Sequence, residues 1–252
     1  MPRVIAMAGK GGTGKTTITA LLINFLLHRK MTPVLAVDAD ANANLNELLG
    51  LKVDLTLGEI RKNLKGEMPP NITRDQFMEM QVHQALIESS GFDLLVMGQP
   101  DGPGCYCAAN QYLAMTMDQL AANYEFILVD NEAGMEHLSR MNLRYIDFLL
   151  VISDPSARGI LTARRIAELT GPLGIEIKNK FLIINRAPES MSADLKKKIT
   201  AAIEGSGMSL AGFIPESSEL TTQEIKGESY LDLPAHVQVL AKSFELFSAI
   251  IK

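Results

Sequence analysis

The clearest chemistry in the chain is carried by nine consecutive residues, Gly9 to Thr17, which read GKGGTGKTT. They satisfy the phosphate-loop pattern G-x-x-x-x-G-K-[ST] and lie between an apolar run and a helix-like run, as that pattern requires. The glycines let backbone N–H groups close around phosphate oxygens, and Lys15 and the helix N-terminus add positive charge. The Thr16 hydroxyl can ligate magnesium. The stretch therefore predicts a nucleotide site in which the contacts come from Gly11, Gly12, Thr13, Gly14, Lys15, Thr16 and Thr17.

Acidic residues follow two further apolar runs. Asp38 and Asp40 come just after the run 34–37, and Asp130 ends the run 126–130, where a Walker B acid stands. Ligands of parallel sheets gather at the carboxyl ends of the strands, and phosphoryl transfer needs carboxylates that order magnesium. The alternative for Asp38 and Asp40 is an ordinary turn or helix-cap role.

The only two cysteines, Cys105 and Cys107, are one residue apart. The backbone between them is too short for a relaxed disulfide, and in an extended chain both thiols point the same way. Two thiolates leave a soft, tetrahedral metal half-coordinated, whereas two copies related by a two-fold axis would supply four. The alternative is a pair of small buried apolar thiols.

The segment K-G-G-T-G-K-T-T resembles the deviant Walker A motif of the MinD/ParA/nitrogenase-iron-protein group of dimeric ATPases. The resemblance implies that Lys10 reaches across a two-fold interface to the partner's nucleotide; otherwise it is a solvated lysine at a loop tip. It also implies that Asp38 and Asp130 hold magnesium through waters and that Asp40 orients the attacking water. The catalytic residues would then be Lys10, Lys15 and Asp40.

Two later strand ends resemble the adenine pocket of that family. Asn185-Arg186 follows an apolar run, and an asparagine can pair with both a donor and an acceptor of a purine edge. Pro215 offers a flat apolar contact. The alternative, for both Asn185-Arg186 and Pro215, is that these residues simply end a strand. The chain departs from the family at Ala41, where proline is frequent, and in the second switch, Asn131–Gly134, of which only Gly134 matches.

The resemblance narrows at residues 98–107, GQPDGPGCYC. This segment resembles the CooC-type maturation ATPases, which help to insert nickel into carbon monoxide dehydrogenase. It implies a loop at about 98–107 in which Cys105 and Cys107 bind nickel or zinc between subunits. It further implies a homodimer formed on ATP or metal binding, and as client a nickel enzyme, carbon monoxide dehydrogenase or acetyl-CoA synthase. The expected cofactors are ATP/ADP, Mg²⁺ and Ni²⁺ or Zn²⁺.

These residues must be positioned by an alternation of strands and helices. Apolar runs predict strands at 3–8, 34–37, 94–97, 126–130, 148–153, 181–185 and 210–214. Helices are expected at 16–29, 44–49, 57–62, 108–122, 156–169, 193–203, 221–226 and 235–251, and the segment 74–88 is either helix or mixed structure. Such alternation predicts an α/β fold with a mostly parallel sheet flanked by helices. Together with the resemblance it implies a single P-loop NTPase domain of the MinD-like (SIMIBI) type over residues 1–252.

Composition limits the partners. With 252 residues, 47% hydrophobic content and a formal charge of −5, the chain is expected to be a globular cytoplasmic protein that binds neither nucleic acid nor membrane. The first strand starts at the N-terminus, so no secretory signal is expected.

Three other functions remain open. A membrane-positioning ATPase of the MinD kind would need a basic amphipathic tail, whereas residues 235–252 contain only Lys242 and Lys252 as cations. A ParA-like DNA-associated ATPase would need a basic face. A reductase like the nitrogenase iron protein would hold an iron–sulfur cluster between subunits, but there the two cysteines come from separate loops.

Overall fold

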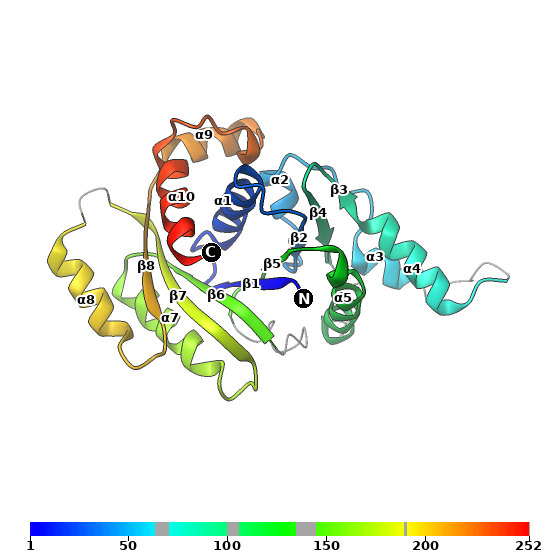
Figure 1. The fold of residues 1–252 in the computed structure, drawn as a ribbon, viewed down its shortest axis with the longest axis horizontal. Coiled ribbons are helices and arrows are strands. Elements are labelled where there is room, and N and C mark those ends of the chain that lie inside the picture. Colours follow the sequence, from blue (N-terminus) through cyan, green and yellow to red (C-terminus); the bar gives the residue numbers. More distant parts are fainter. Residues whose placement is uncertain (64–70, 100–105, 135–144, 189–190, 252) are drawn as a thin grey trace.

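The structure is a computed structural model that describes residues 1–63, 71–99, 106–134, 145–188 and 191–251 (Figure 1). Its described strands form one eight-stranded sheet in the order β3-β4-β2-β5-β1-β6-β7-β8. Every neighbouring pair is parallel except β3 and β4, which are antiparallel. The strands are β1 (Arg3–Gly9), β2 (Val34–Asp38), β3 (Ile87–Glu88), β4 (Phe92–Val96), β5 (Phe126–Asp130), β6 (Tyr145–Ser153), β7 (Glu176–Ala187) and β8 (Ser209–Pro215).

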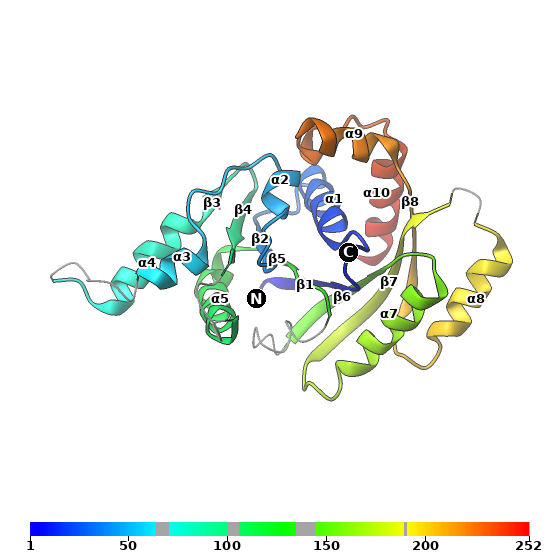
Figure 2. The ribbon, with the colours of Figure 1, turned by 180° about the vertical axis from the view of Figure 1, so that it is seen from behind.

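Helices cover both faces of this sheet (Figures 1 and 2). On one face lie α1 (Lys15–His28), α2 (Leu45–Leu48), α9 (Ser218–Lys226), the 3-10 turn η2 (Tyr230–Asp232) and α10 (Gln238–Ile250). The other face is covered by α7 (Ala157–Leu169) and α8 (Ala193–Ile203), and further along by α3 (Leu57–Asn63), α4 (Arg74–Ala85) and α5 (Tyr106–Leu120), which is followed by η1 (Ala121–Asn123).

The two-sided cover explains why the central strands are continuously apolar. In β1, Ile5 and Met7 join the cluster under α1, whereas Ala6 and Ala8 join the cluster under α7. Strands β2 and β5 are buried along their whole length, as parallel strands with helices on both faces are. Helix α1 is apolar almost all round because it packs between the sheet and α10.

The predicted α/β fold with a mostly parallel, helix-flanked sheet is confirmed. The elements differ in detail: β6 and β7 begin three and five residues earlier than the predicted starts at 148 and 181. The short antiparallel strand β3 was not predicted, and the segment 74–88 resolves into α4, β3 and the link between them. Helix α5 begins at Tyr106 rather than near residue 108, so Cys107 lies within its first turn and not in a loop.

None of the helices in the described part of the chain is long and apolar enough to cross a membrane.

Candidate functional site

The phosphate loop joins β1 to α1 at the carboxyl edge of the sheet. Gly12 and Gly14 have φ angles of 78° and 87°, in the left-handed region that glycine tolerates best. A Cβ on Gly14 would also collide with the Asn185 side chain, so this position needs glycine for two reasons. The loop is closed by Thr13, whose Oγ1 donates to the Lys10 carbonyl at 2.9 Å.

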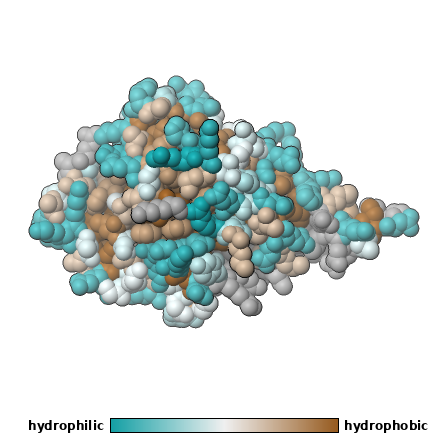
Figure 3. All heavy atoms as spheres, viewed as in Figure 1, coloured by the Kyte–Doolittle hydropathy of each residue, from teal (hydrophilic) through white to brown (hydrophobic). Residues whose placement is uncertain are grey.

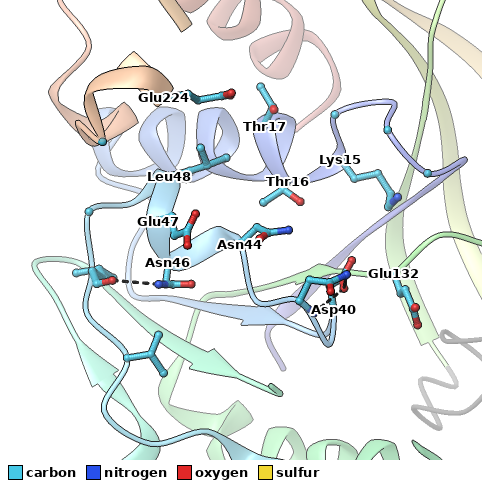
Figure 4. Close-up of a pocket in the computed structure, with 18 of the residues that line it drawn as sticks. Lys15, Thr16, Thr17, Asp40, Asn44, Asn46, Glu47, Leu48, Glu132 and Glu224 are labelled. Carbon is cyan, nitrogen blue, oxygen red and sulfur yellow. Dashed lines mark hydrogen bonds between the residues drawn. The ribbon is translucent and has the colours of Figure 1, made fainter. Parts of the chain in front are cut away.

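Lys15, the first residue of α1, places a cation at the wall of the cleft. Its side chain is buried, and its Nζ lies 3.4 Å from the carbonyl oxygen of Lys10. Burial lowers the pKa of Lys15, while the carboxylates of Asp130, Asp40 and Glu132 act to raise it. Figure 4 shows Lys15, Asp40 and Glu132 gathered at one end of the cleft.

Asp38 and Asp130 lie opposite each other at the ends of the adjacent strands β2 and β5. Asp38 is fully buried and accepts from the backbone N–H groups of Asp40, at 3.1 Å, and Leu45, at 2.9 Å. Burial nevertheless raises the pKa of Asp38 to about 6, against the lowering effect of these hydrogen bonds.

Asp130 is the more exceptional of the two acids. It is 1% exposed, and neither carboxylate oxygen has a partner at hydrogen-bond geometry among the described residues, although the Thr16 and Thr19 hydroxyls lie close enough to lower its pKa. Burial, followed by the charge of Asp38, raises the pKa of Asp130 to about 7, while the Thr16 hydroxyl and the Lys15 ammonium lower it. A buried carboxylate without partners is costly unless it faces a cation. Asp130, Asp38 and the Thr16 hydroxyl therefore fit a magnesium ion, which accepts hard oxygen ligands and keeps its waters.

Asp40 and Glu132 also line the cleft, which has a volume of about 1160 Å³. The Oδ1 atom of Asp40 accepts hydrogen bonds from the backbone and side-chain N–H groups of Asn42, at 2.9 and 3.0 Å. These two bonds hold the loop after β2, which has Ala41 at the position where the family often has proline. Glu132 belongs to the loop after β5, which rests on the phosphate loop because Gly134 N donates to Gly9 O at 3.2 Å.

The structure gives Asn185 and Arg186 contacts with the phosphate loop itself. Asn185 is buried, and its Nδ2 donates to the Thr13 carbonyl at 2.9 Å. Arg186 adopts a left-handed φ of 52° and donates from Nη1 to the Gly12 carbonyl at 3.2 Å. The Nδ2 group of Asn185 is thus engaged on the loop, and the contact of Asn185 with adenine stays a prediction. Pro215 is not brought to the cleft; it lines a second cavity next to β8.

The far wall of the cleft was not predicted from the sequence. It is formed by the α2 region and the C-terminal end of α9, with Asn44, Asn46, Glu47 and Glu224 facing the space between them (Figure 4). Glu224 accepts a hydrogen bond from the hydroxyl of Tyr230, which is completely buried. Burial and the Glu224 carboxylate raise the pKa of Tyr230, so this phenol stays protonated and orients Glu224. These residues belong to no sequence motif. They reach the cleft because the tertiary fold places α9 next to the phosphate loop.

The cysteines and Lys10 stand apart from this geometry. Cys105 lies outside the described residues, as does the side chain of Cys107. Within the described part of the chain, no group of three or more His, Cys, Asp or Glu residues could hold a metal ion. Lys10 is exposed at the tip of the phosphate loop.

Comparison with known proteins places this site in a family. The family described as CobQ/CobB/MinD/ParA nucleotide binding domain matches residues 4–230. The "Uncharacterized ATP-binding protein MJ0685" of Methanocaldococcus jannaschii is 38% identical over 253 residues, which cover 98% of each chain. The "Carbon monoxide dehydrogenase accessory protein CooC" of Rhodospirillum rubrum is 29% identical over 186 residues, covering 68% of this chain and 70% of the relative.

Among solved structures, the septum site-determining protein MinD complexed with Mg-ADP from Pyrococcus horikoshii superposes with a TM-score of 0.75 at 22% identity. That match covers 100% of this chain and 97% of the other, and it shows that the fold is shared. The chain therefore belongs to the CobQ/CobB/MinD/ParA nucleotide-binding family. It is an ATPase of that family.

Proposed function

We propose that the chain is an ATP-driven dimer switch that works with Mg²⁺. The observation that carries its nucleotide and magnesium chemistry is Asp130, a carboxylate at 1% exposure beside the phosphate loop whose oxygens have no partner at hydrogen-bond geometry among the described residues; the dimer rests on the resemblance that Lys10 carries. Such a group is stabilised when a hydrated cation arrives with the nucleotide. The MinD structure with Mg-ADP, which shares this fold, binds that pair of ligands.

Different residues of the cleft bind the phosphates, bind magnesium and orient the attacking water. The backbone N–H groups of the phosphate loop and the Lys15 ammonium would neutralise the phosphates, and Thr16, Asp38 and Asp130 would hold magnesium. Magnesium, when bound, stabilises the charge that develops on the transferred phosphoryl oxygens. Asp40 orients the water that attacks the γ-phosphorus, and the bond to the β–γ bridging oxygen breaks to release ADP and phosphate. Lys10, exposed at the loop tip, supplies the last positive charge to the site of the partner subunit.

The metal cargo is proposed to be nickel or zinc at an intersubunit site. Cys105 and Cys107 from two subunits would make four thiolates, which suits either ion. The likeness to the carbon monoxide dehydrogenase accessory protein CooC supports this assignment, with carbon monoxide dehydrogenase or acetyl-CoA synthase as the client that receives nickel. ATP binding would close the dimer and assemble the site, and hydrolysis would release the metal.

The test is metal content at a known oligomeric state. The parent protein with a non-hydrolysable ATP analogue should bind one nickel or zinc ion per dimer, measured by elemental analysis of the dimer peak. A Cys105→Ser/Cys107→Ser double variant should still dimerise with the analogue but carry no metal. Equal metal content in parent and variant would overturn the metal assignment and leave the ATP switch standing.

A second candidate is a positioning ATPase on membranes. It is favoured by the septum site-determining protein MinD of Helicobacter pylori, which is 27% identical over 234 residues. The C-terminal segment argues against this function. Residues 235–252 contain only two lysines, whereas membrane binding would need a basic amphipathic helix. ATP-dependent sedimentation with anionic liposomes would favour this function over metal delivery.

A further inference from the structure

Strand β7 ends in a β-bulge next to the phosphate loop. Its last four residues, Ile184–Ala187, pair with only three residues of β8, Phe213–Pro215, so β7 carries one extra residue here. Successive side chains of a regular strand point to opposite faces, whereas a bulge changes the direction of the side chains at the extra residue. At this bulge two consecutive side chains, those of Asn185 and Arg186, both reach the phosphate loop.

The neighbouring edge strand β8 is arranged differently. It presents hydrophobic surface between α10 and α8 (Figures 1 and 3), and its last residue, Pro215, lines the second cavity. No residue of β8 lines the nucleotide cleft, whereas Arg186 of β7 does. Of these two strands, β7 is therefore the one that sends side chains to the phosphate loop.

The two side chains at the bulge hold consecutive carbonyl groups of the loop. Asn185 Nδ2 donates to the Thr13 carbonyl at 2.9 Å, and Arg186 Nη1 donates to the Gly12 carbonyl at 3.2 Å. Both carbonyls are thus held on the side of the loop that faces β7.

These two bonds fix the direction of two peptide groups. In a trans peptide the C=O and the N–H point to opposite sides, so carbonyls held on the β7 side turn the N–H groups of Thr13 and Gly14 to the inside of the loop. The Thr13 N–H does point across the loop, since it donates to the Lys10 carbonyl at 3.4 Å. That bond is long, and a charged phosphate oxygen is the stronger acceptor, so a bound phosphate can take the N–H over.

The backbone of Arg186 is strained. Its φ angle is 52°, in the left-handed region that is costly for a residue with a Cβ. The side chain is exposed, and one hydrogen bond at the surface contributes about as much free energy as this conformation costs. The contact of Arg186 with Gly12 therefore adds little net stability to the fold. Strained residues of this kind are typical of ligand sites.

We infer that Arg186 is a positioning residue of the phosphate site. By holding the Gly12 carbonyl it turns the Thr13 N–H toward the phosphate oxygens, as Asn185 does for the N–H of Gly14. Arg186 acts on the phosphates through the loop, and not on the adenine as the family resemblance implies. This inference rests on the proposed binding of phosphates by the loop.

The probe is tripolyphosphate, which carries the phosphates of ATP without the nucleoside. Its affinity and that of ATP, each with Mg²⁺, are measured by isothermal titration calorimetry. Arg186→Ala should weaken both ligands by the same factor, at least about fivefold. Arg186→Lys keeps a charged N–H donor and should recover most of this loss. Contact with adenine would give a different pattern, in which ATP binds more weakly and tripolyphosphate binds as before.

A second arm separates positioning from simple charge. Attraction through space between the guanidinium and the phosphates is screened by salt, whereas the direction of a peptide group is not. The ratio of parent to Arg186→Ala affinity should therefore be the same at about 0.1 M and about 0.5 M salt. Arg165→Ala removes the same charge from an exposed position of α7 that lies outside the cleft, and it should bind both ligands like the parent.

Glycine variants separate the backbone from the side chain. Arg186→Gly removes the guanidinium and the strain together, so it should bind tripolyphosphate as weakly as Arg186→Ala but melt about 2–4 °C higher than that variant. Lys30, just after α1, has a similar φ of 57° and does not line the cleft. Lys30→Gly should melt above Lys30→Ala by the same margin, while both bind like the parent.

Two results would overturn the inference. One is equal tripolyphosphate affinity in the parent and in Arg186→Ala, and the other is a loss in Arg186→Ala that disappears at the higher salt concentration. A parent that binds neither ATP nor tripolyphosphate would overturn the proposed phosphate site itself, and this inference with it.

Discussion

Among single residues, Asp38 and Asp130 are buried carboxyl groups whose ionised form would be stabilised by a bound cation. Burial raises their pKa values to about 6 and about 7, and their unfolded values are near 4. The folded state therefore binds more protons than the unfolded state between about pH 4 and pH 7. Its stability is fully kept below pH 4 and falls as the pH rises through the folded pKa values.

This titration predicts how Asp130→Asn behaves without metal. In EDTA the parent protein should lose thermal stability from pH 5 to pH 8, and Asp130→Asn should lose less. At pH 8 the variant should gain roughly 1–3 kcal/mol in free energy of unfolding, because it no longer ionises a buried carboxyl. Calorimetry across this pH range measures the difference.

The control is Asp118→Asn, at an exposed position of α5, which should follow the parent at every pH. Magnesium and nucleotide should stabilise the parent at pH 8 but not Asp130→Asn. A gain in stability that is the same at pH 5 and pH 8 would contradict the assigned titration.

At the scale of elements, β7 supports the phosphate loop from the side. Asn185, near the end of β7, donates to the Thr13 carbonyl at 2.9 Å from a buried position. Asn185→Ala should therefore destabilise the nucleotide-free protein by roughly 1–2 kcal/mol, as loss of a buried hydrogen bond does. It should also weaken binding of ATP and GTP by the same factor. Chemical denaturation and fluorescent-nucleotide titration measure the two effects.

Asn179→Ala is the matched control, since Asn179 makes a similar side-chain to backbone bond, to Asp147 O at 3.1 Å, farther from the loop on the same strand. It should lower stability without changing nucleotide affinity. If Asn185→Ala instead left stability intact and reduced only the preference for ATP over GTP, Asn185 would be an adenine-reading residue, as the family resemblance implies.

The elements also show what the sequence could predict. The strand 126–130 and the helix 193–203 were predicted to the residue, because unbroken apolar runs and clear helix caps are local signals. The early starts of β6 and β7 could not be seen, since Glu176–Lys180 is polar and is a strand only through its pairing with Tyr145–Leu149. The two-residue strand β3 has no periodicity to detect.

For the site, the contiguous phosphate loop and the strand-end aspartates could be predicted from the sequence. Residues that reach the cleft only through tertiary packing could not be predicted from the sequence. Glu132 acts on the charge of Lys15 because the loop after β5 is hydrogen-bonded to the phosphate loop. Glu224 is oriented in the cleft by a hydrogen bond from the buried Tyr230. The cavity lined by Pro215 follows from the open edge of β8, which depends on the strand order.

In the whole molecule, each active site is expected to be shared by two copies of the chain. Lys10→Ala and Asp40→Ala should each abolish hydrolysis when studied alone, while Lys10→Ala keeps nucleotide binding. A mixture of the two variants should regain activity, because a mixed dimer holds one site with both an intact Asp40 and the partner's intact Lys10. Random pairing makes half the dimers mixed, so about a quarter of the parent activity should return.

This mixing experiment separates a lysine that acts on the partner from one that acts in its own chain. If Lys10 served the site of its own subunit, both sites of a mixed dimer would lack one residue, and mixing would restore nothing. A single steady-state phosphate-release assay at several mixing ratios decides between the two. Lys15→Ala mixed with Asp40→Ala is the negative control, because both residues act in the site of their own subunit and mixing should restore nothing.

Sedimentation equilibrium of the purified chain, with Mg²⁺ and either ADP or a non-hydrolysable ATP analogue, shows whether ATP joins two subunits. An ATP-driven dimer should have a mass near 27.5 kDa with ADP and twice that mass with the analogue, and the dimer should carry one nickel or zinc ion. A monomer that persists when the analogue, Mg²⁺ and the transition metal are all present would contradict it.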